Sequence, residues 1–453
     1  MSDVKTSSPL HIVGGGLAGC ECAWALARAG LPARLYEMRP QTTTPAHETG
    51  RLAELVCSNS FRSDEEATAV GLLKREMEGL GSLVMETARA TAVPAGKALA
   101  VDRARFAGEI TDRLENHPLV EVVRREVTSL DDPELQGGAG IVVAAGPLAS
   151  DPLAADLARV IGVGHLAFFD AIAPIVSFDS IDMEHAFWGS RWRPEDDDYL
   201  NCPLNEAEYH ALVEELRTAG RVPSKEFERH FEACLPVEEM ADRGEMTLAF
   251  GPLKPVGLTD PRTGERPYAV VQLRAENLER TAFNLVGFQT KLTYPEQKRV
   301  FSLIPALREA EFLRLGSIHR NTFVNAPRVL DGRLRLLARP EVRLAGQITG
   351  VEGYLESAAC GLWAGMLAAS EARGLEIPRP PAETALGALM GHLRTEAKDF
   401  QPSNVNFGLM PALGRKMPKR KRKEAYAERA AEAFSAWTGG LPDLGLVGRD
   451  RAE

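Results

Sequence analysis

The sequence predicts an α/β protein in which a nucleotide-binding fold is split between the two ends of the chain. One strand–glycine-turn–helix–strand unit occupies Leu10–Glu37, and a second strand–glycine-turn–helix unit occupies Val342–Ala369. Between about Gly164 and Tyr294 the alternation of strands and helices stops, and aromatic residues and prolines become more frequent. An α+β domain inserted into the nucleotide fold explains this change of character.

The first unit begins with a short apolar run, Leu10–Val13, which is typical of a buried parallel strand. A glycine turn follows, and then an alanine-rich segment with high helix propensity that ends at Gly30. The next strand, Ala33–Tyr36, leads directly into Glu37, which lies 18 residues past Gly19. This order of elements is the one that binds dinucleotides.

The turn itself has the spacing G-x-G-x-x-G, at Gly14, Gly16 and Gly19. These glycines permit a tight turn, close approach of the backbone to a pyrophosphate, and close helix–strand packing. The helix N-terminus offers free N–H groups to the phosphates, and the terminal acid can accept hydrogen bonds from a ribose. The acid favours a nucleotide with a free 2′-hydroxyl, FAD or NAD, over NADP. The candidate contacts are Gly14, Gly15, Gly16, Leu17, Ala18, Gly19 and Glu37.

The second unit reads VRLAGQITGVEGYLESAACGLWAGMLAAS. It predicts a strand over Val342–Ala345, a glycine-rich turn over Gly346–Gly353 and a helix over Tyr354–Ala369, whose small residues allow close packing. Two such units at opposite ends of the chain favour an FAD enzyme, because an NAD dehydrogenase normally needs only the first. The additional candidate contacts are Gly346, Gln347, Gly350, Glu352 and Gly353.

The predicted fold is therefore a Rossmann-like FAD-binding domain of the glutathione-reductase type. We expect it to comprise residues 1–163 and 295–377, with the inserted domain over 164–294 and a helical, basic C-terminal segment over 378–453. Within the first part, we expect a helical, amphipathic segment over Ser63–Ala90 and a helix capped by Asp102.

Composition limits the class of protein. The net charge of −10 gives no global nucleic-acid signature, so any RNA contact must come from a local basic patch. The six cysteines show no zinc spacing, and no metal is expected. Reduced thiols, a polar N-terminus without a signal peptide and the lack of a long apolar run favour a cytoplasmic protein that does not span a membrane.

Two cysteines are candidates for chemistry. Cys57 follows an apolar stretch and precedes Ser58-Asn59-Ser60, in a polar segment that should lie near the nucleotide. Cys234 comes after a predicted short helix and before Pro236, so it should lie at a helix end or in a loop; Cys202 is a weaker candidate of the same kind. An isolated cysteine is more often an inert core residue. The polar residues around Cys57 and its expected position near the nucleotide favour a functional role for it.

The C-terminal segment holds a dense basic cluster of seven cations in nine residues. Against an acidic background, such a cluster at the start of a helix favours contact with a phosphate backbone; the alternative is a loosely held tail. The candidate RNA contacts are Arg415, Lys416, Lys419, Arg420, Lys421, Arg422 and Lys423.

Taken together, these segments resemble the folate- and FAD-dependent tRNA (uracil-5-)-methyltransferases, the TrmFO branch of the GidA/MnmG flavoproteins. The resemblance covers the chain from about Leu10 to about Phe434. Besides VGGGLAG and the basic helix, the matching segments are ETGRLAELVCSNSFRSD, FFDAIAPIV, EACLPVEEMADRG, GPLKPVGL, VGFQTKL, AGQITGVEGYLESAA and NFGLMP.

The resemblance implies that a methylene group from methylenetetrahydrofolate is placed on C5 of the T-loop uridine of tRNA and reduced to a methyl group with electrons from FAD. NADH or NADPH would re-reduce the flavin. Uracil C5 becomes nucleophilic when a thiolate adds to C6, and cysteine suits that task near neutral pH. By resemblance, Cys234 is favoured as the attacking thiolate and Cys57 as a thiol beside the flavin, although the sequence does not separate these roles.

Three alternatives stay open at this point. A related flavoenzyme could act on another uridine, in ribosomal RNA or at the anticodon wobble position as in MnmG, although MnmG-type chains are longer and carry a large helical tail for a protein partner. A plain NAD(P)H-dependent flavoprotein reductase would have no RNA role. The third alternative is an RNA-binding module that carries a nucleotide and catalyses no reaction. No obligate protein partner is expected.

Overall fold

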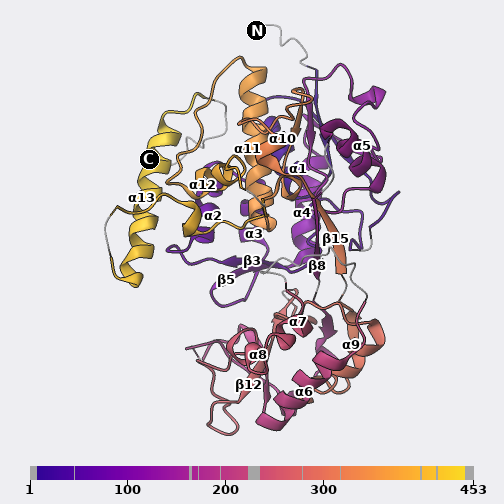
Figure 1. Cartoon of the computed structure of the whole chain (residues 1–453), viewed down its shortest axis with the longest axis vertical. Coiled ribbons are helices and arrows are strands. Elements are labelled where there is room, and N and C mark those ends of the chain that lie inside the picture. Colours follow the sequence, from indigo (N-terminus) through magenta and orange to yellow (C-terminus); the bar gives the residue numbers. More distant parts are fainter. Residues whose placement is uncertain are drawn as a thin grey trace.

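The structure of the chain is a computed structural model that describes residues 8–44, 46–162, 166–171, 173–193, 195–222, 235–277, 279–316, 318–397, 400–414 and 417–443. Residues 166–171, 318–321 and 419–420 are described by their backbone alone. The molecule consists of an upper body, which contains the N-terminal and C-terminal parts of the chain, and a lower body formed by the middle of the chain (Figure 1).

The upper body is built on a parallel sheet of five strands in the order β16-β7-β1-β2-β6. Its strands are β1 (Leu10–Val13), β2 (Ala33–Glu37), β6 (Val120–Arg124), β7 (Ile141–Val143) and β16 (Val342–Leu344). In register, Val13 lies beside Val143, and Val143 beside Leu344. The carboxyl ends of β1, β7 and β16 therefore meet at one edge. The second glycine unit completes the sheet that the first begins, which confirms the predicted split α/β fold.

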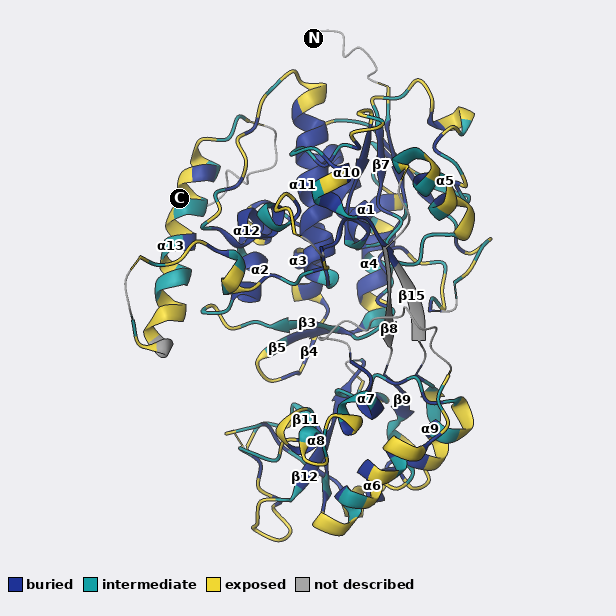
Figure 2. Cartoon of the chain, in the orientation of Figure 1, coloured by how far each residue is buried: buried dark blue, intermediate teal, exposed yellow. Residues whose placement is uncertain are grey.

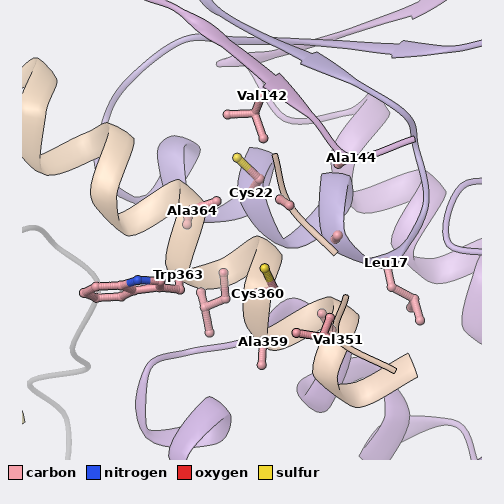
Figure 3. Close-up of a cluster of buried hydrophobic side chains, with 14 of the residues drawn as sticks. Leu17, Cys22, Val142, Ala144, Val351, Ala359, Cys360, Trp363 and Ala364 are labelled. Atoms are coloured by element: carbon pink, nitrogen blue, oxygen red, sulfur yellow. The ribbon is translucent and has the colours of Figure 1, made fainter. Parts of the chain in front are cut away.

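The two helices that follow the glycine turns, α1 (Leu17–Arg28) and α11 (Tyr354–Ala372), pack against each other. Their contact is made largely of small buried side chains (Figure 3). A Cβ atom on Gly361 would lie 2.1 Å from the backbone oxygen of Ala18, and one on Gly365 would lie 2.8 Å from Ala25 Cβ. The close packing predicted from the small residues of the second helix is confirmed.

The segment after β2 differs in part from the prediction. The segment Ser63–Ala90 is helical over most of its length, as expected, but it holds two helices, α2 (Ala69–Gly79) and α3 (Leu83–Ala90), and its first residue ends the strand β3 (Ser60–Ser63). Gly81 adopts a φ of 73°, which ends α2 and reverses the chain. Asp102 does cap α4 (Arg103–Glu115), since its side chain accepts a hydrogen bond from the N–H of Arg105 at 3.0 Å. The remaining helices and strands of this body are β4 (Ala92–Val93), β5 (Ala98–Val101), α5 (Asp151–Ile161), α10 (Ala326–Val329), α12 (Ala385–His392) and α13 (Lys419–Gly439).

The lower body contains a sheet of six strands in the order β10-β11-β12-β13-β9-β14, in which every pairing is antiparallel. The strands are β9 (Ile175–Ser177), β10 (Phe187–Trp188), β11 (Tyr199–Leu204), β12 (Ala269–Ala275), β13 (Ala282–Leu285) and β14 (Phe312–Arg314). Its helices are α6 (Glu206–Thr218), α7 (Val237–Asp242), α8 (Thr247–Phe250) and α9 (Tyr294–Phe301). This sheet continues to Arg314, past the expected boundary at 294/295; the division into domains stays a prediction.

Two antiparallel strands, β8 (Leu166–Ala171) and β15 (Ile318–Phe323), lie at the junction between the two bodies (Figure 1). Each body has its own apolar core, one around α1 and α11 and the other around β12 and α6 (Figure 2). None of the helices that the structure describes combines the length and apolar character needed to cross a membrane.

Candidate active site

A pocket lies at the edge of the parallel sheet where β1, β7 and β16 end. Its walls come from segments far apart in the chain: the first glycine turn, the end of β2, the turn after β7 and the start of α11. The expected dinucleotide contacts that line it are Gly14, Gly15, Gly16, Leu17, Ala18, Glu37, Gly346 and Gln347. The other expected contacts, which are not among its lining residues, are Gly19, Gly350, Glu352 and Gly353. Both predicted glycine turns therefore reach one pocket.

The first glycine turn has the geometry that a phosphate cradle needs. Gly14 has a φ of 110°, and a Cβ there would lie 2.5 Å from the backbone oxygen of Ala144. A Cβ on Gly19 would lie 1.9 Å from the oxygen of Gly14, so only glycine allows the helix to pack this close to the strand. At Gly16, in contrast, no described residue other than its chain neighbours comes within 4 Å of the Cβ position, and the backbone faces open space. A pyrophosphate can approach there, beside the N-terminus of α1.

Glu37, the acid at the end of β2, is 5% exposed and accepts four hydrogen bonds. The N–H of Gly15 donates to Oε2 at 3.0 Å. Arg39 donates its backbone N–H and Nε to Oε1, each at 2.9 Å, and Nη2 to Oε2 at 3.1 Å. Burial opposes ionisation, but the Arg39 guanidinium outweighs it and lowers the pKa of Glu37 below its usual value. Glu37 is thus a carboxylate whose acceptor positions are filled, and a ribose hydroxyl would share or replace one of these donors.

Arg39 was not predicted from the sequence. It is 2% exposed, and besides Glu37 it also pairs with Glu54 at 2.9 Å. Glu54 in turn accepts hydrogen bonds from the backbone N–H groups of Glu48 and Thr49. This network is buried at Arg39 and reaches the surface at Glu48 and Thr49. It fixes the segment after β2 against the pocket wall, a role for Glu54 that the sequence did not indicate.

The second glycine turn presents Gln347 to the pocket. Gln347 Nε2 donates to Glu352 Oε2 at 2.9 Å, and Glu352 is 4% exposed. Gly346, Gly350 and Gly353 all have φ values between 79° and 112°, which side chains rarely adopt. Glu352 therefore orients Gln347 from behind, while the three glycines allow the turn to bring the start of α11 to the pocket.

The loop that carries Cys57 lies beside this pocket. The Tyr354 hydroxyl, at the first residue of α11, accepts hydrogen bonds from the N–H of Cys57 at 2.6 Å and of Ser58 at 3.1 Å. Tyr354 and Val56 both line the pocket. Burial raises the pKa of Tyr354, so the ring is a neutral phenol at physiological pH. Cys57 is half-buried and lies one hydrogen bond from a residue that would contact the bound nucleotide.

Cys234, the other candidate, lies outside the described residues, as does the predicted helix over Ser224–Glu232. The chain is described again from Leu235, and α7 follows at once. Within α7, Glu238 is buried and accepts hydrogen bonds from Thr290 Oγ1 at 2.9 Å and the N–H of Lys291 at 2.7 Å. The segment that follows Cys234 is thus anchored to the lower body by the VGFQTKL segment.

The remaining cysteines are poorly suited to nucleophilic chemistry. Cys202 lies in the buried strand β11 rather than in the expected loop, and burial raises its pKa to about 12. Cys22 and Cys360 are also fully buried, with pKa values raised to about 12 and about 11. Among the cysteines that the structure describes, Cys57 alone is more than marginally exposed. No group of three or more metal-binding side chains gathers anywhere in the described part of the chain.

The basic cluster lies at the start of α13. Arg415 and Lys416 fall outside the described residues, and Lys419 and Arg420 are described by their backbone alone. The other three, Lys421, Arg422 and Lys423, are exposed. Further along, α13 is anchored to the upper body: Trp437 Nε1 donates to the oxygen of Pro378 at 3.0 Å, and a Cβ on Gly79 would lie 2.9 Å from the ring of Phe434. The helix is a packed element that exposes its basic end.

Comparison with known proteins gives consistent relatives. Residues 9–376 match the family described as glucose inhibited division protein A. The methylenetetrahydrofolate–tRNA-(uracil-5-)-methyltransferase TrmFO of Oleidesulfovibrio alaskensis is 62% identical over 433 residues, which cover 95% of this chain and 97% of that protein. The protein of the same name from Geobacter sulfurreducens is 56% identical over 430 residues, covering 94% and 98% of the two chains.

Among solved structures, that of Aquifex aeolicus GidA in its form II crystal superposes with a TM-score of 0.68 at 17% identity. The match covers 99% of this chain and 76% of that one. At this identity the likeness concerns the fold, and it extends over both bodies of the molecule.

Proposed function

Because the chain belongs to the glucose inhibited division protein A family, we propose that it is a methylenetetrahydrofolate–tRNA (uracil-5-)-methyltransferase that uses FAD and forms 5-methyluridine in the T-loop. Full-length relatives at 54–62% identity carry the name of this activity. The observation that carries the proposal is the position of the Cys57 loop, which is hydrogen-bonded to Tyr354 in the wall of a dinucleotide pocket.

The pocket fits FAD. Gly16 leaves space for the pyrophosphate, Glu37 lies where the adenosine ribose would bind, and the start of α11 with Gln347 reaches the far side of the pocket. FAD, when bound, supplies the electrons that reduce the transferred one-carbon group, and NADH or NADPH renews them. The residues of the chain bind and orient this cofactor, and both glycine turns contribute to that task.

The cysteines carry the chemistry on uracil. We assign Cys234 to the attack: its thiolate forms a bond to C6, so that C5 attacks the methylene of the folate. The C5 proton then leaves to a base, and the bond between the methylene carbon and the folate nitrogen breaks, so that tetrahydrofolate leaves. A hydride, whose electrons the reduced cofactor would supply, adds to the exocyclic methylene as the C6–sulfur bond breaks, which leaves a methyl group and frees the thiolate of Cys234. Cys57, held against the pocket by Tyr354, is the thiol beside the flavin.

The RNA substrate is bound in part by the basic start of α13, where exposed cations can contact phosphates. The target base must leave its stack to reach the pocket, as in other enzymes that modify bases. The reaction requires folate, a nicotinamide nucleotide and tRNA and no second protein. We expect it to take place in the cytoplasm.

The test follows labelled carbon from methylenetetrahydrofolate into an unmodified tRNA transcript, with NADH present, and then locates the labelled nucleotide. The proposal predicts label in one T-loop uridine and none when S-adenosylmethionine is the donor. A ribosomal RNA transcript in the same assay serves as the comparison. Label in the ribosomal RNA alone would show that ribosomal RNA is the substrate. NADH oxidation without label in either RNA would show that the protein is a flavin reductase and not a methyltransferase.

A further inference from the structure

The Cys57 loop is held from the lower body as well as from the upper one. Arg274, on β12 of the lower body, donates Nη2 to Ser58 Oγ at 2.7 Å and Nε to Asn59 Oδ1 at 2.9 Å. These two acceptors are the residues directly after Cys57. Arg274 is 7% exposed, so its guanidinium is committed to this contact rather than to solvent.

Asn59 completes the connection. Its Nδ2 donates to the backbone oxygen of Ala275, next to Arg274, at 2.9 Å, and to that of Val101 in the upper body at 3.0 Å. Asn59 is fully buried. A single side chain therefore bridges β12 and β5, and Arg274 fixes its orientation by binding the other end of its amide.

From the upper body, Arg103 at the start of α4 holds the same loop. Its Nη1 donates to the backbone oxygen of Leu55 at 2.5 Å and its Nη2 to that of Cys57 at 3.3 Å. Arg103 also pairs with Glu276, which follows β12. Arg103 from the upper body therefore binds the Leu55–Cys57 side of the loop, and Arg274 from the lower body binds the Ser58–Asn59 side. Glu276 of the lower body pairs with Arg103 and so links the two bodies.

In the part of the chain that the structure describes, the charges at this loop do not cancel. Arg103 and Arg274 bring two buried positive charges and Glu276 brings one negative charge, and the hydrogen-bond acceptors of Arg274 in the described structure are neutral. Among the described residues, Tyr199 on β11 and Tyr354 on α11 also lie near these arginines; burial raises the pKa of both, so both are neutral. Burial lowers the pKa of Arg274 and Glu276 opposes that shift, yet a guanidinium keeps its proton at neutral pH.

We propose that Arg274 is a positioning residue for Cys57: acting through Ser58 and Asn59, it holds the thiol beside the dinucleotide pocket, and its charge favours the thiolate form. Through this contact, a residue of the lower body fixes the position of Cys57 beside the dinucleotide pocket of the upper body. This inference deepens the proposed function, because it rests on a role for Cys57 in the methyl transfer.

The test uses the full-length protein with bound cofactor and measures the rate at which iodoacetamide alkylates Cys57 as a function of pH, by mass spectrometry of the Cys57 peptide. In Arg274→Gln, removal of an opposite charge near the thiol raises the midpoint of this profile by about one pH unit. In Arg274→Lys, the charge stays and the midpoint stays near that of the parent. A lysine cannot bind Ser58 and Asn59 with the fork of a guanidinium, so kcat for methyl transfer falls about tenfold or more while KM for tRNA is unchanged.

The matched control is Arg280→Gln, which removes an arginine of the same body that pairs with the exposed Asp197. It leaves both the alkylation profile and kcat unchanged. A purely structural role for Arg274 would lower the melting temperature without moving the alkylation midpoint, and that result overturns the proposal. If Arg274→Gln fails to fold, Arg274→Lys decides alone, and a kcat equal to that of the parent refutes the positioning role. Alkylation is measured without substrate, so the outcome is separate from whether tRNA is methylated.

Discussion

Gly361 offers the sharpest test of how the two glycine units build one site. Gly361 lies on α11, and a Cβ there would be 2.1 Å from the oxygen of Ala18 and 2.5 Å from its Cα. Ala18 is the second residue of α1 and lines the dinucleotide pocket. Because these are backbone atoms, no side chain can turn aside, and Gly361→Ala must push α1 and its turn away from α11.

The size of the effect follows from the geometry. Ala18 would have to move by about 0.9 Å to bring the contact from 2.1 Å to the 3.0 Å below which real Cβ contacts are essentially never found. Overpacking of this kind costs about 1–3 kcal/mol of folding stability. The displacement also opens the cradle at Gly16, so we expect the purified variant to retain FAD at a fraction of the parent's occupancy and to bind added FAD at least about tenfold more weakly, the equivalent of about 1.4 kcal/mol.

The assay combines the flavin absorbance of the purified protein, titration with FAD and thermal unfolding. Gly391→Ala is the control, because Gly391 lies near the end of α12 and, outside its own helix, no described residue comes within 4 Å of its Cβ position. That change should be neutral or stabilise by about 0.5–1 kcal/mol. If Gly361→Ala retained the parent's FAD content and melting temperature, the reasoning from the helix crossing to the cofactor site would be refuted.

Three further predictions concern other parts of the molecule. Tyr354→Phe keeps the ring but removes the acceptor of two N–H groups, so unfolding free energy should fall by about 2 kcal/mol in urea denaturation; an unchanged value would show that the loop does not depend on this hydroxyl. Burial raises the pKa of Glu76 to about 7 from an ordinary 4.5, so its contribution to stability is full below about pH 4.5 and is lost as pH rises through 7, a change of roughly 3 kcal/mol. Melting measured over this pH range should therefore depend less on pH in Glu76→Gln than in the parent. The same dependence of melting on pH in both proteins would contradict this. Replacing Lys421, Arg422 and Lys423 by alanine should weaken tRNA binding, measured by filter binding at several salt concentrations. The slope of log Kd against log salt should fall by about 0.7–0.9 for each phosphate that is no longer bound. A slope equal to that of the parent would contradict the assignment of these residues to RNA contact.

The sequence predicted the parts of the fold that depend on local patterns. The strands and helices around both glycine turns, the small residues where α1 and α11 cross and the cap at Asp102 all follow from spacing and residue type. The helical segment expected over Ser63–Ala90 is divided into two helices at Gly81, where the backbone reverses. A periodic pattern does not reveal such a reversal unless the glycine is recognised as a helix end.

Contacts between distant segments could not be predicted. Arg39 looks like a surface charge in the sequence, and only the fold brings Glu54 within 2.9 Å of it. Arg274 lies 215 residues from Asn59, and nothing in the pattern of β12 distinguishes its side chain from that of any other strand arginine. Cys202 was expected in a loop because proline follows it, yet it lies in a buried strand. Residue type indicated which groups could do chemistry, and burial decides which of them are free to do it.

The chemistry proposed for this protein requires one of its cysteines to add to C6 of uracil beside a bound flavin. A tRNA transcript containing 5-fluorouridine tests it most directly, because the fluorine replaces the proton that must leave C5, and the C6–sulfur bond then persists. We predict a covalent protein–RNA adduct whose peptide map places the nucleotide on Cys234. No adduct with a preparation that methylates ordinary tRNA, or an adduct on a residue other than cysteine, would contradict the account.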